Sequence, residues 1–159
     1  MQIYLLRHGI AEDGKPGSRD ADRALAPEGK RKLREVLRHA KAAGASPSLI
    51  LTSPYKRALE TAEIAASVLE YSAGLLHTSS LEPGSSPVAV WDEVRVHKDE
   101  KAVMLVGHEP LFSAVTAFLL NTAALQIDFK KGALVRIDVT SFGAQPYGVL
   151  KWMMTAKLA

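Results

Sequence analysis

The chain contains no cysteine, which excludes disulfide cross-links, thiolate nucleophiles and zinc sites built on thiolates. Its charge is nearly balanced, with 20 basic and 17 acidic residues, and so small an excess does not indicate nucleic-acid binding. Long hydrophobic runs are also missing, since no stretch approaches the length needed to cross a bilayer. The apolar run at the N-terminus ends at Arg7, too early for the core of a signal peptide. We therefore expect a soluble, cytoplasmic protein that binds neither nucleic acid nor a membrane.

The rest of the composition is that of an ordinary globular protein, with 47% hydrophobic and 23% charged residues. A chain of 159 residues is long enough to bury a core of its own without metals or disulfides. No internal repeat, low-complexity tract or linker divides it. We therefore expect a single domain over residues 1–159.

Short apolar segments that indicate buried strands alternate with longer amphipathic segments that indicate helices. Strands are predicted over residues 3–6, 49–52, 75–77, 102–106, 133–139 and 149–154. Helices are predicted over residues 27–43, from the pair Ser53-Pro54 to about 69, from 85–87 onward, and over 111–119. This order predicts an α/β three-layer sandwich around a mainly parallel sheet. The alternating pattern of residues 133–139 adds an antiparallel strand at the sheet edge.

Polar clusters follow the ends of several predicted strands. Residues 7–9 follow the first strand, residues 53–57 follow the second, and residues 107–110 follow the strand that ends at Val106. In an open parallel sheet, ligands bind beyond the carboxyl ends of the strands. The sequence therefore predicts that these clusters meet at one edge of the sheet.

The clusters carry two histidines, His8 and His108, and two arginines, Arg7 and Arg57. A guanidinium group matches the oxygens of a phosphoryl group with a planar set of donors. A histidine that is neutral near pH 7 is a competent nucleophile, and a protonated one is a further anion clamp. The set suits phosphoryl transfer without a metal ion.

Four sets of residues follow one another in order and spacing over roughly residues 1–120. They are Leu6-Arg7-His8-Gly9, then Arg23 with Leu25 and Gly29, then Ser53-Pro54 with Arg57-Ala58 and Thr61-Ala62, and finally Gly107-His108. Together they resemble the motifs of the histidine phosphatase superfamily, which includes the cofactor-dependent phosphoglycerate mutases. The short chain and its Arg-His-Gly-Ile-Ala opening look closest to the SixA branch, whose members remove phosphate from phosphohistidine on proteins. The resemblance implies a phosphoglycerate mutase-like fold.

By this resemblance His8 is the nucleophile that becomes phosphorylated, while Arg7, Arg57 and His108 hold the phosphoryl oxygens. Gly9 belongs to the same phosphate-binding set. The resemblance implies no cofactor. The expected partners are a phosphohistidine-bearing protein and a phosphate or other oxyanion in the pocket.

Two further residues are candidates for the pocket. Arg23 resembles a phosphate-binding residue, although it comes from a polar loop. Glu82 is the candidate for the glutamate general acid of larger family members, an acid that the SixA branch need not keep. Without such an acid, an alkoxide leaves poorly, whereas an imidazole with a pKa of about 6.5 can leave already protonated. Phosphohistidine is therefore the expected substrate.

Alternative interpretations stay open at this point. The protein could instead act on a small phosphorylated metabolite as a phosphatase or mutase, or bind phosphate without catalysis. A metal site is not expected, because no His-Glu-x-x-His pattern or carboxylate cluster accompanies the histidines. Ser53 is interpreted as a helix N-cap and not as a nucleophile, because no Gly-x-Ser-x-Gly context surrounds it.

Overall fold

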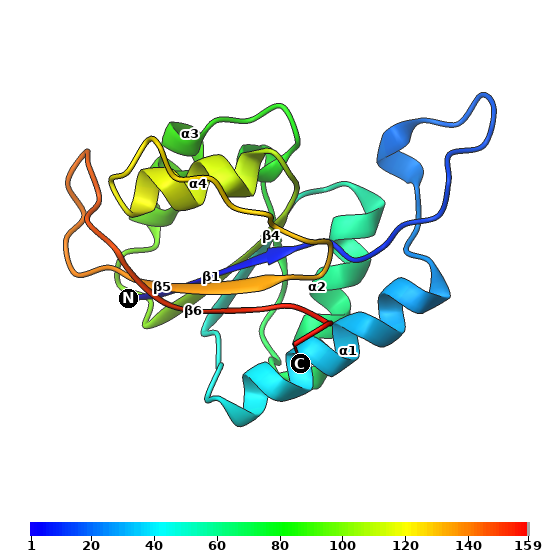
Figure 1. Ribbon diagram of the computed structural model, residues 1–159, viewed down its shortest axis with the longest axis horizontal. Coiled ribbons are helices and arrows are strands. Elements are labelled where there is room, and N and C mark those ends of the chain that lie inside the picture. The colour runs from blue at the N-terminus through cyan, green and yellow to red at the C-terminus, as the bar shows by residue number, and fades with distance from the viewer. Residues whose placement is uncertain (159) are drawn as a thin grey trace.

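A computed structural model describes residues 1–158 as one six-stranded sheet with helices on both faces (Figure 1). The strands are β1 (Gln2–Arg7), β2 (Leu49–Thr52), β3 (Leu76–His77), β4 (Ala102–Gly107), β5 (Leu134–Asp138) and β6 (Val149–Met154). The α-helices are α1 (Pro27–Ala42), α2 (Lys56–Val68), α3 (Pro87–Val96) and α4 (Leu111–Leu119). Two 3-10 turns complete the set, η1 (Asp20–Asp22) and η2 (Ser79–Leu81).

The sheet has the strand order β3-β2-β4-β1-β5-β6. Strands β3, β2, β4 and β1 run parallel to one another, and β5 pairs with β1 in the antiparallel direction. The antiparallel strand predicted near the C-terminus is therefore present as β5. The edge itself is β6, which pairs antiparallel with β5 on its outer side. The α/β sandwich with a mainly parallel sheet is confirmed.

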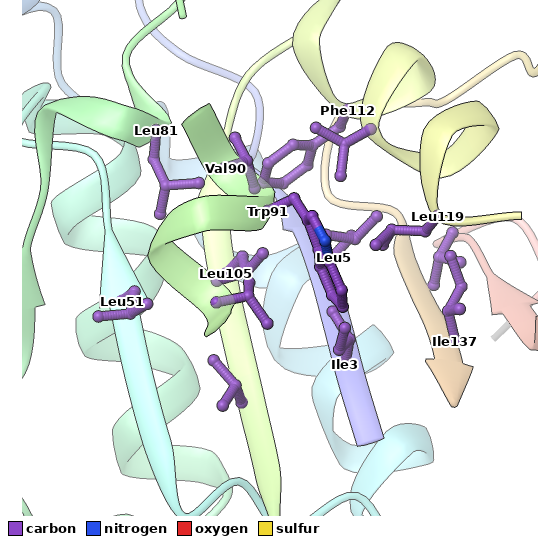
Figure 2. Close-up of a cluster of buried hydrophobic side chains, with 14 of the residues drawn as sticks. Ile3, Leu5, Leu51, Leu81, Val90, Trp91, Leu105, Phe112, Leu119 and Ile137 are labelled. Atoms are coloured by element: carbon purple, nitrogen blue, oxygen red, sulfur yellow. The ribbon is translucent and has the colours of Figure 1, made fainter. Parts of the chain in front are cut away.

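Alternate side chains of β1 enter two separate hydrophobic cores, because successive side chains of a strand point to opposite faces. Ile3 and Leu5 pack with α3 and α4, and Figure 2 shows this core with Trp91 and Phe112 over the sheet. Tyr4 and Leu6 pack on the other face with α1 and α2. Both faces of the strand are fully buried, and each large apolar side chain buried in this way contributes about 1.5–3 kcal/mol.

Helix α1 lies very close to the loop that follows β1. A Cβ atom added to Gly29 would lie 2.2 Å from the carbonyl oxygen of Ile10, so only glycine allows this approach. The backbone of Ile10 also accepts a hydrogen bond from Ala26, just before α1. The first turn of α1 and the loop after β1 are therefore held together as one unit.

The start of α2 differs from the sequence prediction. The helix begins at Lys56, with Tyr55 at the N-cap position, and the hydroxyl oxygen of Ser53 accepts the Tyr55 N–H at 3.2 Å without capping the helix. Ser53 as a helix N-cap was therefore wrong. The segment 53–55 remains extended or bent because the hydroxyl of Ser53 also contacts His108, which holds it at the end of β2.

Within residues 1–158 no helix combines the length and the apolar character needed to cross a membrane.

Candidate active site

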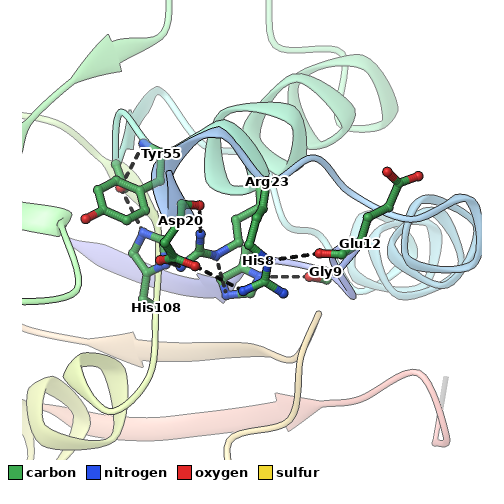
Figure 3. A network of polar contacts seen from close by, with 9 residues as sticks. His8, Gly9, Glu12, Asp20, Arg23, Tyr55 and His108 are labelled. Atoms are coloured by element: carbon green, nitrogen blue, oxygen red, sulfur yellow. Dashed lines mark hydrogen bonds and ion pairs between the residues drawn. The ribbon is translucent and has the colours of Figure 1, made fainter. Parts of the chain in front are cut away.

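Neighbouring parallel strands bring the polar clusters together, as the sequence predicts. In the sheet register Arg7 at the end of β1 lies opposite Gly107 at the end of β4. The N–H of His8 donates to the carbonyl of Gly107 at 2.9 Å. The rings of His8 and His108 consequently lie with their centroids 5.2 Å apart. Figure 3 shows the two rings side by side, with Tyr55 and Asp20 next to them.

The hydrogen bonds of His8 determine its tautomer. Its Nδ1 lies 2.7 Å from the carbonyl oxygen of Gly9, which can only accept, so Nδ1 carries the hydrogen and Nε2 carries the free lone pair. Arg57 donates to that Nε2 through its Nε at 3.3 Å. The side chain is almost buried, with 6% of its surface exposed. Burial, opposed in part by the Gly9 hydrogen bond and reinforced by Arg57, Arg7 and Lys131, lowers the pKa of His8 to about 4.

Gly9 fits its place because it has no side chain. An added Cβ atom would lie 2.6 Å from a methyl carbon of Leu33 in α1. The Gly9 N–H donates to the hydroxyl of Thr61 at 3.2 Å, and that hydroxyl donates to the carbonyl of Arg57. The residue whose carbonyl fixes the tautomer of His8 is therefore itself held in place through its N–H.

Arg57 lies in the first turn of α2 and is held by every one of its nitrogens. Besides the contact with His8, Nη1 donates to the backbone oxygen of Asp20 at 2.9 Å and Nη2 donates to its carboxylate at 3.1 Å. The guanidinium group also lies over the ring of Tyr55, 5.1 Å from its centroid. Its Nε is thus directed at the lone pair of His8.

His108 is almost completely buried, with 1% of its surface exposed. Its Nε2 lies 2.8 Å from the hydroxyl oxygen of Ser53. Burial, together with the charges of the neighbouring His8 and Arg57, lowers the pKa of His108 to about 3. Both histidines are therefore neutral at physiological pH in this arrangement.

Two buried nitrogens of the site have no hydrogen-bond partner within residues 1–158, Nε of Arg7 and Nδ1 of His108. Arg7 otherwise donates through Nη1 to the carbonyl of Phe129 at 2.6 Å. A buried donor without an acceptor costs about 1–3 kcal/mol. A bound oxyanion has the acceptor oxygens that the Nε–H of Arg7 needs, and that Nδ1 of His108 needs when it carries a hydrogen.

Comparison with known proteins agrees with this arrangement. A model of the Histidine phosphatase superfamily (branch 1) matches residues 3–78. An uncharacterized protein of a Picosynechococcus strain is 31% identical over 138 residues, which cover 85% of this chain and 83% of the relative.

The chain belongs to the histidine phosphatase superfamily. This confirms the family to which the motifs pointed. Among solved structures, the protein histidine phosphatase SixA complexed with tungstate has a TM-score of 0.87 at 22% identity, covering 99% of this chain and 98% of that one. A mycobacterial glucosyl-3-phosphoglycerate phosphatase has a TM-score of 0.71 at 16% identity, covering 94% and 96%. The phosphoglycerate mutase-like fold is thereby confirmed, and membership of the superfamily supports a phosphatase activity.

The structure places Arg23 one layer outside the histidines. Its Nε donates to the carbonyl of Glu12 at 2.9 Å, and Nη1 pairs with the carboxylate of Asp20 at 3.1 Å. Arg23 reaches the superfamily motif residues through Asp20, which also binds Arg57. Figure 3 shows this chain of contacts from Glu12 to the histidines.

The structure places Glu82 directly after η2, half-buried and with its backbone in the turn that leads to α3. Within residues 1–158 its carboxylate forms no hydrogen bond or ion pair with His8, Arg57 or His108. The motif residues are therefore brought together, whereas Glu82 is not joined to them.

Asp20 and Tyr55 were not singled out from the sequence. Asp20 belongs to the polar loop between the first two motifs, and the spacing Asp20-x-x-Arg23 in a 3-10 turn was the available signal. Tyr55 packs edge-on against His108 at 5.1 Å between centroids. Its position two residues before Arg57 could have indicated it.

No group of three or more histidine and carboxylate side chains that could hold a metal ion occurs in the part of the chain that the structure describes.

Proposed function

We propose that the protein is a phosphatase that moves the phosphoryl group of a protein phosphohistidine first to His8 and then to water. The observation that carries this proposal is the state of His8. Its ring is neutral, its Nδ1–H is held by Gly9, and its Nε2 lone pair faces the guanidinium group of Arg57. A nucleophile prepared in this way needs no general base.

In the first step Nε2 of His8 attacks phosphorus, and the bond from phosphorus to the substrate imidazole breaks. Arg7, Arg57 and His108 hold the equatorial oxygens, and Gly9 lines the same pocket. Burial is the main cause of the low pKa of His108, and the nearby cations lower it further. Arrival of a phosphoryl dianion offsets these cations and favours the protonated, donating form of His108. Donors that are preorganised for the transition state supply most of the catalysis in such a site.

In the second step water attacks phosphorus, the bond to Nε2 of His8 breaks, and inorganic phosphate leaves. The proton released by water is taken up by the phosphate that forms. The neutral imidazole of His8 is thereby restored, again held by Gly9.

The choice of phosphohistidine rests on the acids near the pocket. Asp20 is the carboxylate that contacts Arg57, and its hydrogen bond with Arg23, aided by Arg57, lowers its pKa. At neutral pH it has no proton to donate, and within residues 1–158 the carboxylate of Glu82 makes no hydrogen bond or ion pair with His8, Arg57 or His108. A leaving group that needs no proton donor, such as a protonated imidazole, suits this site. The likeness to a SixA structure with bound tungstate also supports an oxyanion pocket.

A small phosphorylated metabolite is the second candidate substrate. It is favoured by the fold shared with a glucosyl-3-phosphoglycerate phosphatase. Phosphate binding without catalysis is a weaker alternative, because binding alone does not require a buried, neutral histidine whose Nε2 faces Arg57.

The test compares kcat/KM of the purified protein on phosphohistidine with that on phosphoserine and sugar phosphates. Labelled substrate should leave acid-labile phosphate on His8, and His8→Ala should abolish turnover while the circular dichroism spectrum is retained. The matched control is His39→Ala, on the exposed side of α1. Faster turnover of sugar phosphates would select the metabolite alternative, and label on His108 would overturn the nucleophile.

A further inference from the structure

A cationic cavity adjoins the catalytic histidine on its β5 side. It has a volume of about 480 Å³. Its walls come from the end of β1, the first half of α1, the loop before β5 and the segment after β6. In Figure 1 this last segment lies alongside α1. The charged residues of its lining, which we call the lysine groove, are Arg7, Lys32, Lys130, Lys131, Lys157 and Asp128.

The charges of the lysine groove are only partly neutralised. Asp128 pairs with Lys130 at 2.6 Å, and Lys32 pairs with Glu28 outside the groove at 2.9 Å. Lys131 and Lys157 form no ion pair within residues 1–158, and both are exposed. The groove therefore presents unpaired positive charge to the solvent.

The groove is continuous with the active site through the backbone. The N–H of Gly132 donates to the carbonyls of both Arg7 and His8, at 3.2 and 3.0 Å. This double hydrogen bond fixes Lys131 beside the catalytic strand end. Arg7 belongs to both places, because it lines the groove and precedes the nucleophile. The charge of Lys131 also contributes to the low pKa of His8.

The kind of cation in the groove indicates the kind of anion that it suits. A single phosphoryl group is matched by arginine forks, and the histidine site already has two arginines. The groove instead offers several flexible, strongly hydrated ammonium groups spread over a wide opening, which suits several separate carboxylates. We propose that the lysine groove holds acidic side chains next to the phosphohistidine of the protein substrate. This rests on the proposed function and adds a substrate class to it.

The test uses two synthetic peptides of equal length, each with one central phosphohistidine introduced by phosphoramidate. One has glutamates on both sides of the phosphohistidine and the other has glutamines. The measured quantity is the ratio of kcat/KM between the two peptides. This ratio cancels any effect of a variant on the chemical step, including an effect of Lys131 on His8.

We expect the wild-type protein to prefer the acidic peptide by about tenfold at low salt, because several exposed charge pairs each add a modest gain. The variant K131E/K157E should lose this preference or reverse it. Salt at about 500 mM should also reduce the preference, since screening is then nearly complete within a few ångströms. The control K98E/K101E makes the same change of charge before β4, at the opposite end of that strand from Gly107, and should keep the wild-type ratio.

A second measurement does not depend on turnover. The unphosphorylated acidic peptide, labelled for fluorescence anisotropy, should bind wild-type protein more tightly than K131E/K157E. Equal turnover of both peptides, or a preference that survives in K131E/K157E, would overturn the lysine groove while leaving the phosphatase assignment intact. Binding of the acidic peptide without hydrolysis of either phosphopeptide would instead overturn the proposed function and retain the groove.

Discussion

Replacing Arg57 with lysine separates the geometry of this side chain from its charge. Arg57 donates in three directions, to Nε2 of His8, to the backbone oxygen of Asp20 and to the Asp20 carboxylate. A lysine has a single nitrogen, so it can keep the positive charge but cannot point at His8 and at Asp20 together. Loss of one preorganised donor typically costs about 10²–10³-fold in rate. We expect kcat/KM of Arg57→Lys to fall by about this factor.

The assay measures kcat/KM on phosphohistidine together with the dissociation constant of tungstate. In Arg57→Lys both kcat/KM and the affinity for tungstate should fall. The midpoint of the acid limb of kcat/KM should stay close to that of wild type, because burial, the main cause of the low pKa of His8, is unchanged. Arg31→Lys is the matched control, since Arg31 lies exposed on α1 and pairs with Glu35 at 3.0 Å. An Arg57→Lys protein within a factor of a few of wild type would refute the assignment of Arg57 to the pocket.

Four further outcomes are expected. The acid limb of kcat/KM should have its midpoint near pH 4 and not near 6.5, because the proposed nucleophile is neutral His8, whose burial lowers its pKa to about 4. A midpoint near 6.5 would contradict the burial argument. Because the pKa values of His8 and His108 are low in the folded protein, the unfolded chain binds more protons than the folded one below pH 6.5. The free energy of unfolding should therefore fall by about 1.4 kcal/mol per pH unit for each histidine as the pH drops from 6.5 toward 4. This fall should be less steep in His108→Ala. Glu82→Gln should change hydrolysis of phosphohistidine and of phosphoserine weakly and to the same extent, since the Glu82 carboxylate makes no hydrogen bond or ion pair with His8, Arg57 or His108 within residues 1–158. A selective loss on phosphoserine would make it a general acid. EDTA should leave the activity intact, whereas tungstate should inhibit it. Inactivation by EDTA that zinc or magnesium reverses would contradict the metal-independent mechanism.

The positions of His8 and His108 could be predicted because they depend on strand ends. Buried strands such as residues 102–106 are evident from uninterrupted apolar runs, and parallel strands place the residues that follow them at one edge. The order of the strands then decides which clusters become neighbours. Since β4 lies between β1 and β2, His8, Ser53 and His108 had to meet.

The contacts made by loop side chains could not be predicted in the same way. Residues 11–26 have no hydrophobic period that fixes their path, so nothing in the sequence shows that Asp20 lies between Arg57 and Arg23. For the same reason the sequence gives no measure of how far Glu82 lies from the histidines. The prediction of Ser53 as a helix N-cap failed for a different reason. Ser-Pro is a common start of a helix, whereas here the Ser53 hydroxyl forms a hydrogen bond with His108.

The close approach of Gly29 to Ile10 also bears on how this protein can change over time. The segment after β1 has helix α1 against it at Gly29 and again at Leu33, which touches Gly9. A methyl group at either glycine would push on the stretch of backbone that carries His8, although Gly29 itself has no part in the proposed chemistry. In a library of single variants, substitutions that abolish activity should therefore occur not only at the histidines but also along one side of α1, at positions that no substrate reaches. Adaptation to new substrates is then confined to exposed side chains of the other walls, such as Lys131 and Lys157, which can change without moving the backbone of helix α1 against His8.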